Sequence, residues 1–97
     1  MKVVFHPKAE LDFLNACHFY KDCEPQVALR FDRAVSSVVD SLRTRADIGW
    51  PHLCDTRLER VRGFPYGVIF LNHGDCILVV AISHTSRRPG YWADRLT

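Results

Sequence analysis

The stretch from Gly67 to Ile82, GVIFLNHGDCILVVAI, consists of two apolar runs on either side of a polar centre. Gly67–Leu71 and Cys76–Ile82 are apolar at consecutive positions and rich in β-branched residues, which is typical of strands buried on both faces. The residues between them, Asn72–Asp75 (NHGD), have the composition of a tight turn. The stretch therefore predicts a buried β-hairpin.

The segment after this hairpin, Ser83–Arg95 (SHTSRRPGYWADR), adds cations, a histidine and two aromatic residues to the end of the second run. His84 and the arginines that follow it stand where the predicted strand leaves the sheet. Binding and catalytic residues are common on such connecting segments, so we expect a contact surface here. Around Tyr91–Leu96 we expect a short turn or helix.

Upstream of the hairpin, a third strand is predicted over Arg57–Arg62. Its residues alternate so that Leu58, Arg60 and Arg62 share one face. The segment before it, Ala46–Thr56, contains a glycine and a proline and has no sustained periodicity, which predicts a long loop.

The first half of the chain begins with a short strand and a helix. Val3–Phe5 predict the strand, and Pro7 suits the first turn of a helix that runs to about Asp22. The apolar positions expected on this helix are Leu11, Leu14 and Cys17, with Phe13, Ala16 and Tyr20 on the flank.

A second helix follows the brief connector Cys23–Pro25. Its apolar residues recur at alternating spacings of three and four, which is the pattern of an amphipathic helix. The short connector predicts an antiparallel helical hairpin whose apolar stripe covers a sheet. The predicted order is β-α-α-β-β-β. The residues of the stripe are Ala28, Phe31, Val35, Val38 and Leu42.

Three sequence elements carry a resemblance to a known family. Pro7-Lys8-Ala9 leads into the first helix, Phe64-Pro65-Tyr66 precedes an apolar strand, and the tail combines His84 with Arg87-Arg88-Pro89 and Tyr91-Trp92. Together they resemble the RelE/ParE superfamily, the toxins of bacterial toxin-antitoxin modules. The resemblance spans nearly the whole chain. It implies an α+β fold, with an N-terminal helical hairpin packed on a mainly antiparallel sheet and a short C-terminal helix or turn.

Length and composition are those of one small soluble domain. The 97 residues are enough for a single core, so we expect one domain over residues 1–97. The chain is 47% apolar and 25% charged, which is ordinary for a globular protein. No apolar run approaches the roughly 20 residues of a membrane-spanning helix, and no secretion signal is evident. We expect a cytoplasmic protein that does not enter the membrane.

The cysteines do not indicate a metal centre. Cys17, Cys23, Cys54 and Cys76 lack the CxxC spacing of zinc sites, and a cytoplasmic chain keeps its thiols reduced. We expect free thiols and neither a metal ion nor another cofactor.

Charge is unevenly distributed along the chain. Residues 1–56 carry seven Lys/Arg and eight Asp/Glu, whereas residues 57–97 carry six arginines and three acids. The second half is therefore the better contact surface for an acidic partner, such as an antitoxin segment, a phosphate backbone or an acidic protein patch. The alternative is an ordinary solvated sheet face.

The basic residues of the second half could serve metal-free RNA cleavage. That reaction needs a base for the 2′-hydroxyl, cations for the charge at phosphorus and an acid for the leaving oxygen. Histidine titrates in the right range. By resemblance to the RNases of the superfamily, His84, Arg87 and Tyr91 would be catalytic. The residues expected to bind the partner are Arg60, Arg62, Arg88 and Trp92.

Each of these residues also has a purely structural interpretation. The tail arginines Arg87, Arg88 and Arg95 could pair with Asp75, Asp94 or Glu59, and exposed pairs contribute little. Trp92 could pack the tail onto the sheet instead of stacking on a base.

Three functions remain open from the sequence. The Phe-Pro-Tyr element and the tail resemble ParE-like toxins, which are thought to poison DNA gyrase by binding. All three lysines, Lys2, Lys8 and Lys21, lie in the first half, whereas RelE-type enzymes, which cut mRNA on the ribosome, place lysines among their catalytic groups. The third function is a non-toxic binding or regulatory module. The sequence leaves open whether the chain is an enzyme. In each toxin reading a cognate antitoxin, acidic and partly disordered, would bind apolar helix and sheet-edge surface.

Overall fold

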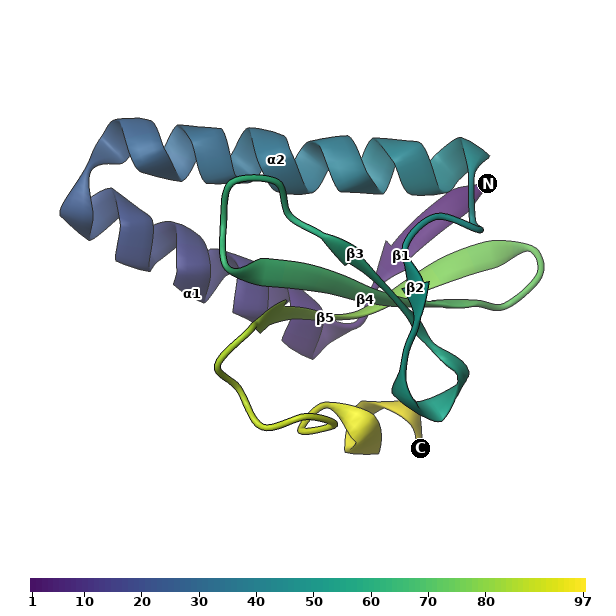
Figure 1. Ribbon diagram of the computed structural model, residues 1–97. Coiled ribbons are helices and arrows are strands. Elements are labelled where there is room, and N and C mark those ends of the chain that lie inside the picture. Colours follow the sequence, from purple (N-terminus) through teal and green to yellow (C-terminus); the bar gives the residue numbers. More distant parts are fainter.

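Two helices and a C-terminal tail cover opposite faces of a five-stranded sheet (Figure 1). The structure is a computed structural model that describes residues 1–97. The predicted α+β fold, with a helical hairpin packed on the sheet, is confirmed. The elements are β1 (Lys2–Phe5), α1 (Pro7–Cys23), α2 (Pro25–Thr44), β2 (Trp50–Pro51), the 3-10 helix η1 (Leu53–Asp55), β3 (Arg57–Arg60), β4 (Tyr66–Asn72), β5 (Cys76–His84) and the 3-10 helix η2 (Ala93–Leu96).

The sheet is mainly antiparallel, as predicted. Its strand order is β1-β5-β4-β3-β2, and only the β1–β5 pair is parallel. The predicted hairpin from Gly67 to Ile82 forms the β4–β5 pair near the middle of the sheet. A parallel pair needs a long crossover connection, and the helical hairpin is the first part of the chain between β1 and β5.

The segment 46–56 is not the plain loop that the sequence predicted. It contains β2, whose Trp50 and Pro51 pair with Leu58 and Arg57. Two residues are too few to produce an alternating pattern, so this strand has no sequence signal. The Arg57 guanidinium donates to the carbonyl oxygens of Asp47, Ile48 and Gly49 at 2.8–2.9 Å and so ties the segment to β3.

The strand predicted over residues 57–62 is shorter than expected. β3 ends at Arg60, and the chain then turns, with the Phe64 N–H donating to the Val61 carbonyl oxygen at 3.1 Å. The predicted common face of Leu58, Arg60 and Arg62 is therefore wrong for Arg62, which lies in the turn.

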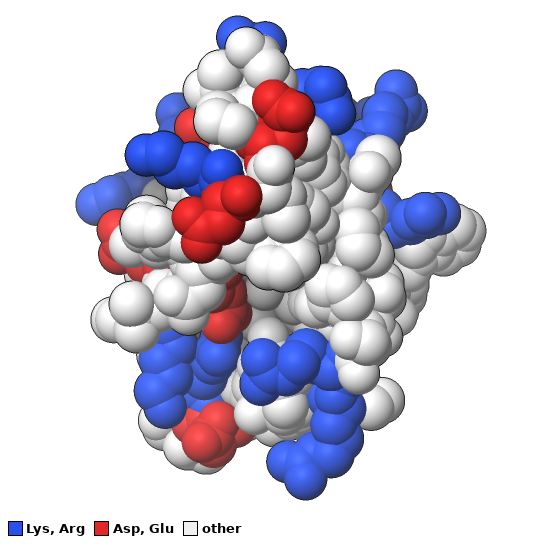
Figure 2. Space-filling model, turned by 90° about the vertical axis from the view of Figure 1, so that its left-hand side faces the viewer, with Lys and Arg blue, Asp and Glu red and all other residues white.

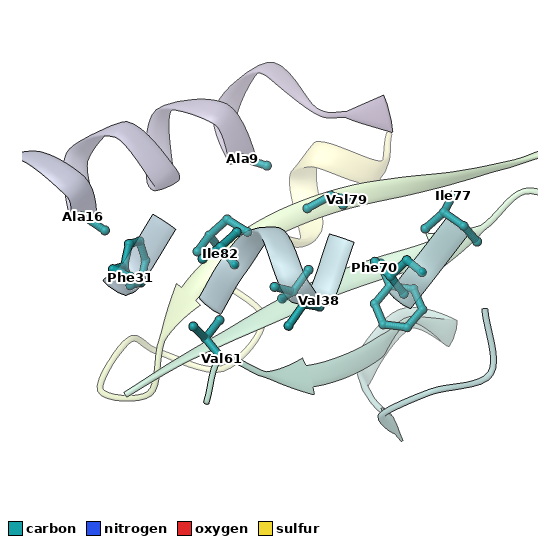
Figure 3. Packing of buried hydrophobic residues seen from close by; sticks show 12 residues of the cluster. Ala9, Ala16, Phe31, Val38, Val61, Phe70, Ile77, Val79 and Ile82 are labelled. Carbon is teal, nitrogen blue, oxygen red and sulfur yellow. The ribbon is translucent and has the colours of Figure 1, made fainter. Parts of the chain in front are cut away.

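The helices pack on the sheet through a large apolar cluster (Figure 3). The predicted stripe of α2 is confirmed for Phe31, Val35, Val38 and Leu42, which are all buried. On α1 the prediction was wrong for Leu11 and Leu14, which are 56% and 48% exposed, whereas the other predicted positions, Phe13, Ala16, Cys17 and Tyr20, belong to the cluster or pack against it. The residues of α1 that are buried are the small Ala9 and Ala16, which allow the helix to approach Phe31, Val79 and Ile82 closely (Figure 3).

A second, smaller apolar cluster lies on the other face of the sheet. Trp92 of the tail is 1% exposed and packs with Ile69, Val80 and Ala81. This cover explains why β4 and β5 are apolar at consecutive positions. The register between the two strands shifts at Ile69/Phe70, and Val80 and Ala81, neighbours in the chain, both belong to this cluster.

No helix of the structure has both the length and the apolar character required to cross a membrane. No three His, Cys, Asp or Glu side chains come together in a way that could hold a metal ion. All four cysteines are free thiols.

A cation-lined cavity as the candidate functional site

A cavity of about 530 Å³ lies where β3, β4 and β5 meet the first part of the tail. Its lining includes the apolar side chains of Leu58, Ile69 and Trp92 together with several polar and aromatic ones. No Asp or Glu side chain lines it. The residues predicted for the site that do line it are Arg60, His84, Arg87, Arg88 and Trp92.

The three arginines of the cavity have no acidic partner. Arg60, Arg87 and Arg88 are exposed, and none of them forms an ion pair within 4.0 Å, since the three salt bridges of the chain involve other residues. The alternative interpretation, in which tail arginines pair with Asp75, Asp94 or Glu59, is not borne out, because none of the three salt bridges joins such a pair. Lys and Arg side chains are prominent in the lower part of the face shown in Figure 2. The cavity can therefore attract an anionic group.

The tautomer of neutral His84 follows from its hydrogen bond with Ser86, two residues along the chain. The Ser86 backbone N–H donates to His84 Nδ1 at 3.0 Å, and Ser86 Oγ lies 2.7 Å from the same nitrogen. A backbone N–H can only donate, so Nδ1 must accept, and the proton of the neutral ring is on Nε2. The ring packs edge-on against Tyr66, with 5.0 Å between ring centroids. His84 thus offers the cavity a hydrogen-bond donor.

Tyr66 also lines the cavity and was not predicted as a site residue, although its Phe-Pro-Tyr element was noted. Burial, followed by the nearby Tyr20 and Asp12, raises the pKa of the Tyr66 hydroxyl above its usual value. The phenol therefore keeps its proton at neutral pH. With His84 as a donor, Tyr66 neutral and no carboxylate present, the cavity is equipped to bind anions and lacks a ready general base.

Tyr91 lies beside the cavity instead of lining it. The Arg87 guanidinium stacks over the Tyr91 ring, 3.9 Å from its centroid, and the Arg95 guanidinium lies 5.3 Å from the same centroid. Such cation–π contacts hold flexible arginines in place. Tyr91 therefore contacts the cavity through Arg87.

Arg95 is held in turn by α1. It donates to the Asp12 carboxylate at 2.7 and 3.3 Å and to the Val80 carbonyl oxygen at 3.0 Å. Burial alone would lower the pKa of Arg95, but the hydrogen bond and charge of Asp12 raise it overall. No sequence signal predicted this pair, because its partners are separated by 83 positions.

Arg62 is separate from this site. It lines a different hollow of about 530 Å³ between α2 and β3, together with Arg33, Ser37 and Glu59. Arg60 contributes to both hollows. Trp92, predicted to bind a partner, is buried, which agrees with its structural interpretation as an anchor of the tail.

One family model matches most of the chain. Residues 3–89 match the family described as the ParE toxin of the type II toxin-antitoxin system parDE. A chain of the solved "Chromosomal ParDE TA system from P. aeruginosa" has the same fold, with a TM-score of 0.79 and 22% identity. The similarity covers 87% of this chain and 95% of that chain. No curated protein matches at a significant level.

Proposed function

Because the chain belongs to the ParE toxin family of type II toxin-antitoxin systems, we propose that it is a cytoplasmic growth inhibitor that binds and poisons DNA gyrase. A cognate antitoxin would neutralise it. The toxin would act by occupying its target and would not turn over a substrate. The choice of gyrase comes from the resemblance of the tail and the Phe-Pro-Tyr element to ParE-like toxins.

The observation that carries this proposal is the state of His84. A base that takes a proton from a 2′-hydroxyl needs an unprotonated nitrogen facing the substrate. In neutral His84 the unprotonated nitrogen is Nδ1, which already accepts the Ser86 N–H. Moving the proton to Nδ1 would break that bond. The site therefore supports binding better than proton transfer.

Ribosome-dependent mRNA cleavage is the second candidate. One observation favours it. A single cavity that no Asp or Glu side chain lines contains His84, Arg60, Arg87 and Arg88. Such a set could hold a phosphodiester, because arginine recognises phosphate through several parallel hydrogen bonds.

The experiment that separates the two is induction of the chain in a bacterium without its antitoxin. Plasmid supercoiling, the DNA-damage response and mRNA 5′ ends are followed at early times. Gyrase-linked DNA breaks with intact transcripts support the proposal. New mRNA cleavages with normal DNA would replace it with the nuclease, and no growth effect would favour a non-toxic binding module.

A variant of His84 sharpens this test. His84→Asn keeps an oxygen that can accept the Ser86 N–H but has no titrating ring. A gyrase poison should keep its toxicity in this variant, whereas a nuclease that uses His84 should lose it. His73→Asn, in the exposed β4–β5 turn, is the matched control and should leave both activities unchanged.

We propose that the antitoxin binds the outer surface of the helical hairpin, α1 and α2. Leu11, Leu14 and Leu29 are each about half exposed, at 48–56%, and Leu14 and Leu29 line a groove of about 370 Å³ between the helices. Large apolar side chains left in solvent commonly mark a protein contact. An amphipathic segment of the antitoxin would bury them.

A further inference from the structure

Asp12 is a carboxylate of α1 that serves two partners in the second half of the chain. It accepts two hydrogen bonds from the Arg95 guanidinium and a third, at 3.2 Å, from the Ile82 backbone N–H. The side chains of Arg95 and Asp12 are only 9% and 15% exposed. This is the one salt bridge of the chain that is shielded from solvent.

The contacts continue from this pair into the cavity. Arg95 lies against the Tyr91 ring, and the other guanidinium against that ring is Arg87. Arg87 is exposed and forms no ion pair of its own. An exposed arginine has many rotamers, so stacking on a ring in a defined position determines where its donors lie.

The tail has an anchor besides the Asp12–Arg95 pair. Trp92 is buried against Ile69, Val80 and Ala81 on the sheet, and burial of such a side chain is a strong anchor. A buried ion pair contributes little net stability compared with apolar packing, but it specifies one arrangement of its partners. The particular effect of Asp12 is therefore to fix the position of the Arg95 side chain.

We propose that Asp12 is a positioning residue for the cavity: through Arg95 and Tyr91 it sets the place of Arg87, so that α1 determines the arrangement of the cation that contacts the target. The contact with a target rests on the proposed function, whereas the positioning itself does not.

The positioning is tested by NMR spectroscopy of the full chain. Protons of the Arg87 side chain should be shifted by the ring current of Tyr91. Asp12→Asn should remove this shift while the backbone spectrum and the Trp92 indole signal remain those of the folded protein. Tyr91→Phe should retain it, because the ring remains. Asp40→Asn, which breaks the exposed pair with Arg43, should also retain it.

Arg95→Lys is a second variant in case Asp12→Asn fails to fold. It keeps the charge but loses the planar fork that binds Asp12 and Val80 together, and it should also remove the shift. An unchanged Arg87 shift in a folded Asp12→Asn or Arg95→Lys chain overturns the proposal.

A double-mutant cycle tests the consequence for activity. Binding to purified gyrase is measured for Asp12→Asn, Arg87→Gln and the double variant. Each single change should weaken binding to purified gyrase about tenfold. The double variant should be no weaker than Arg87→Gln alone, because Asp12 acts through Arg87.

Additive losses in the cycle would mean that Asp12 acts independently of Arg87 and would overturn the positioning. If the unmodified chain inhibits no growth and binds no gyrase, the proposed function fails instead. The NMR comparison then decides the positioning by itself.

Discussion

At the scale of single residues, Tyr20 and Tyr66 make the fold sensitive to alkaline pH. Burial is the first cause that raises the pKa of both phenols, and the electrostatic effect of the nearby Cys23 adds to it at Tyr20. In the unfolded chain they ionise near pH 10.0, so above that pH the unfolded chain binds fewer protons than the folded one. The free energy of unfolding should therefore fall as pH rises past 10. Urea titrations at a series of pH values would measure this fall. The free energy of unfolding of Tyr66→Phe should fall less steeply than that of the unmodified chain, because one of the two phenols is missing. A stability that is flat or rises over this range contradicts the prediction.

The residues of the cavity were predictable where they follow a strand end. The sequence predicted that His84, Arg87 and Arg88 lie together, because a buried strand and the point where it leaves the sheet can be recognised in the sequence. Arg62 was misplaced, because the alternating pattern continues past the residue where β3 ends. Asp12 gave no signal, since its role depends on a contact across the whole chain.

At the scale of elements, the outer surface of the helical hairpin can be tested apart from the cavity. Leu14→Asp should weaken antitoxin binding at least tenfold, because a charge would enter an apolar contact. The stability of the Leu14→Asp variant should differ little from that of the unmodified chain, since Leu14 is 48% exposed. Leu53→Asp is a matched control, 47% exposed on η1, and should bind normally. Affinities are measured by calorimetry with the purified antitoxin, and equal losses in both variants would contradict a contact on the hairpin.

The helices illustrate how far periodicity predicts packing. On α2 the three-and-four spacing identified the buried face, because most of its large apolar residues recur there, with Leu29 the exposed exception. On α1 large apolar residues occur all round, and the prediction centred the buried face on Leu11, Leu14 and Cys17, with Ala16 only on its flank. The buried positions are Ala9 and Ala16, since close packing on the sheet needs small residues.

At the scale of the whole molecule, the two apolar clusters should unfold together. They lie on opposite faces of β4 and β5 and so share the same strands. Trp92 reports on one cluster and the helical far-UV circular dichroism on the other, with Trp50→Phe removing the exposed tryptophan. The two urea transitions should coincide. Phe31→Ala should move both midpoints to lower urea concentration, because loss of the buried ring lowers the free energy of unfolding by about 3–5 kcal/mol. Separate midpoints would contradict the single domain expected from chain length.

The order in which the fold is assembled follows from the pairing of its ends. β1 lies beside β5, and Asp12 binds Arg95, so neither contact can form until the later of its two partners has been translated. While a ribosome still holds residues 84–96, β1 can already pair with Cys76–Val79, but the nascent chain lacks the part of the cavity lining that His84, Arg87, Arg88 and Trp92 supply. The lining of the cavity can therefore be completed only after Trp92 has left the ribosome.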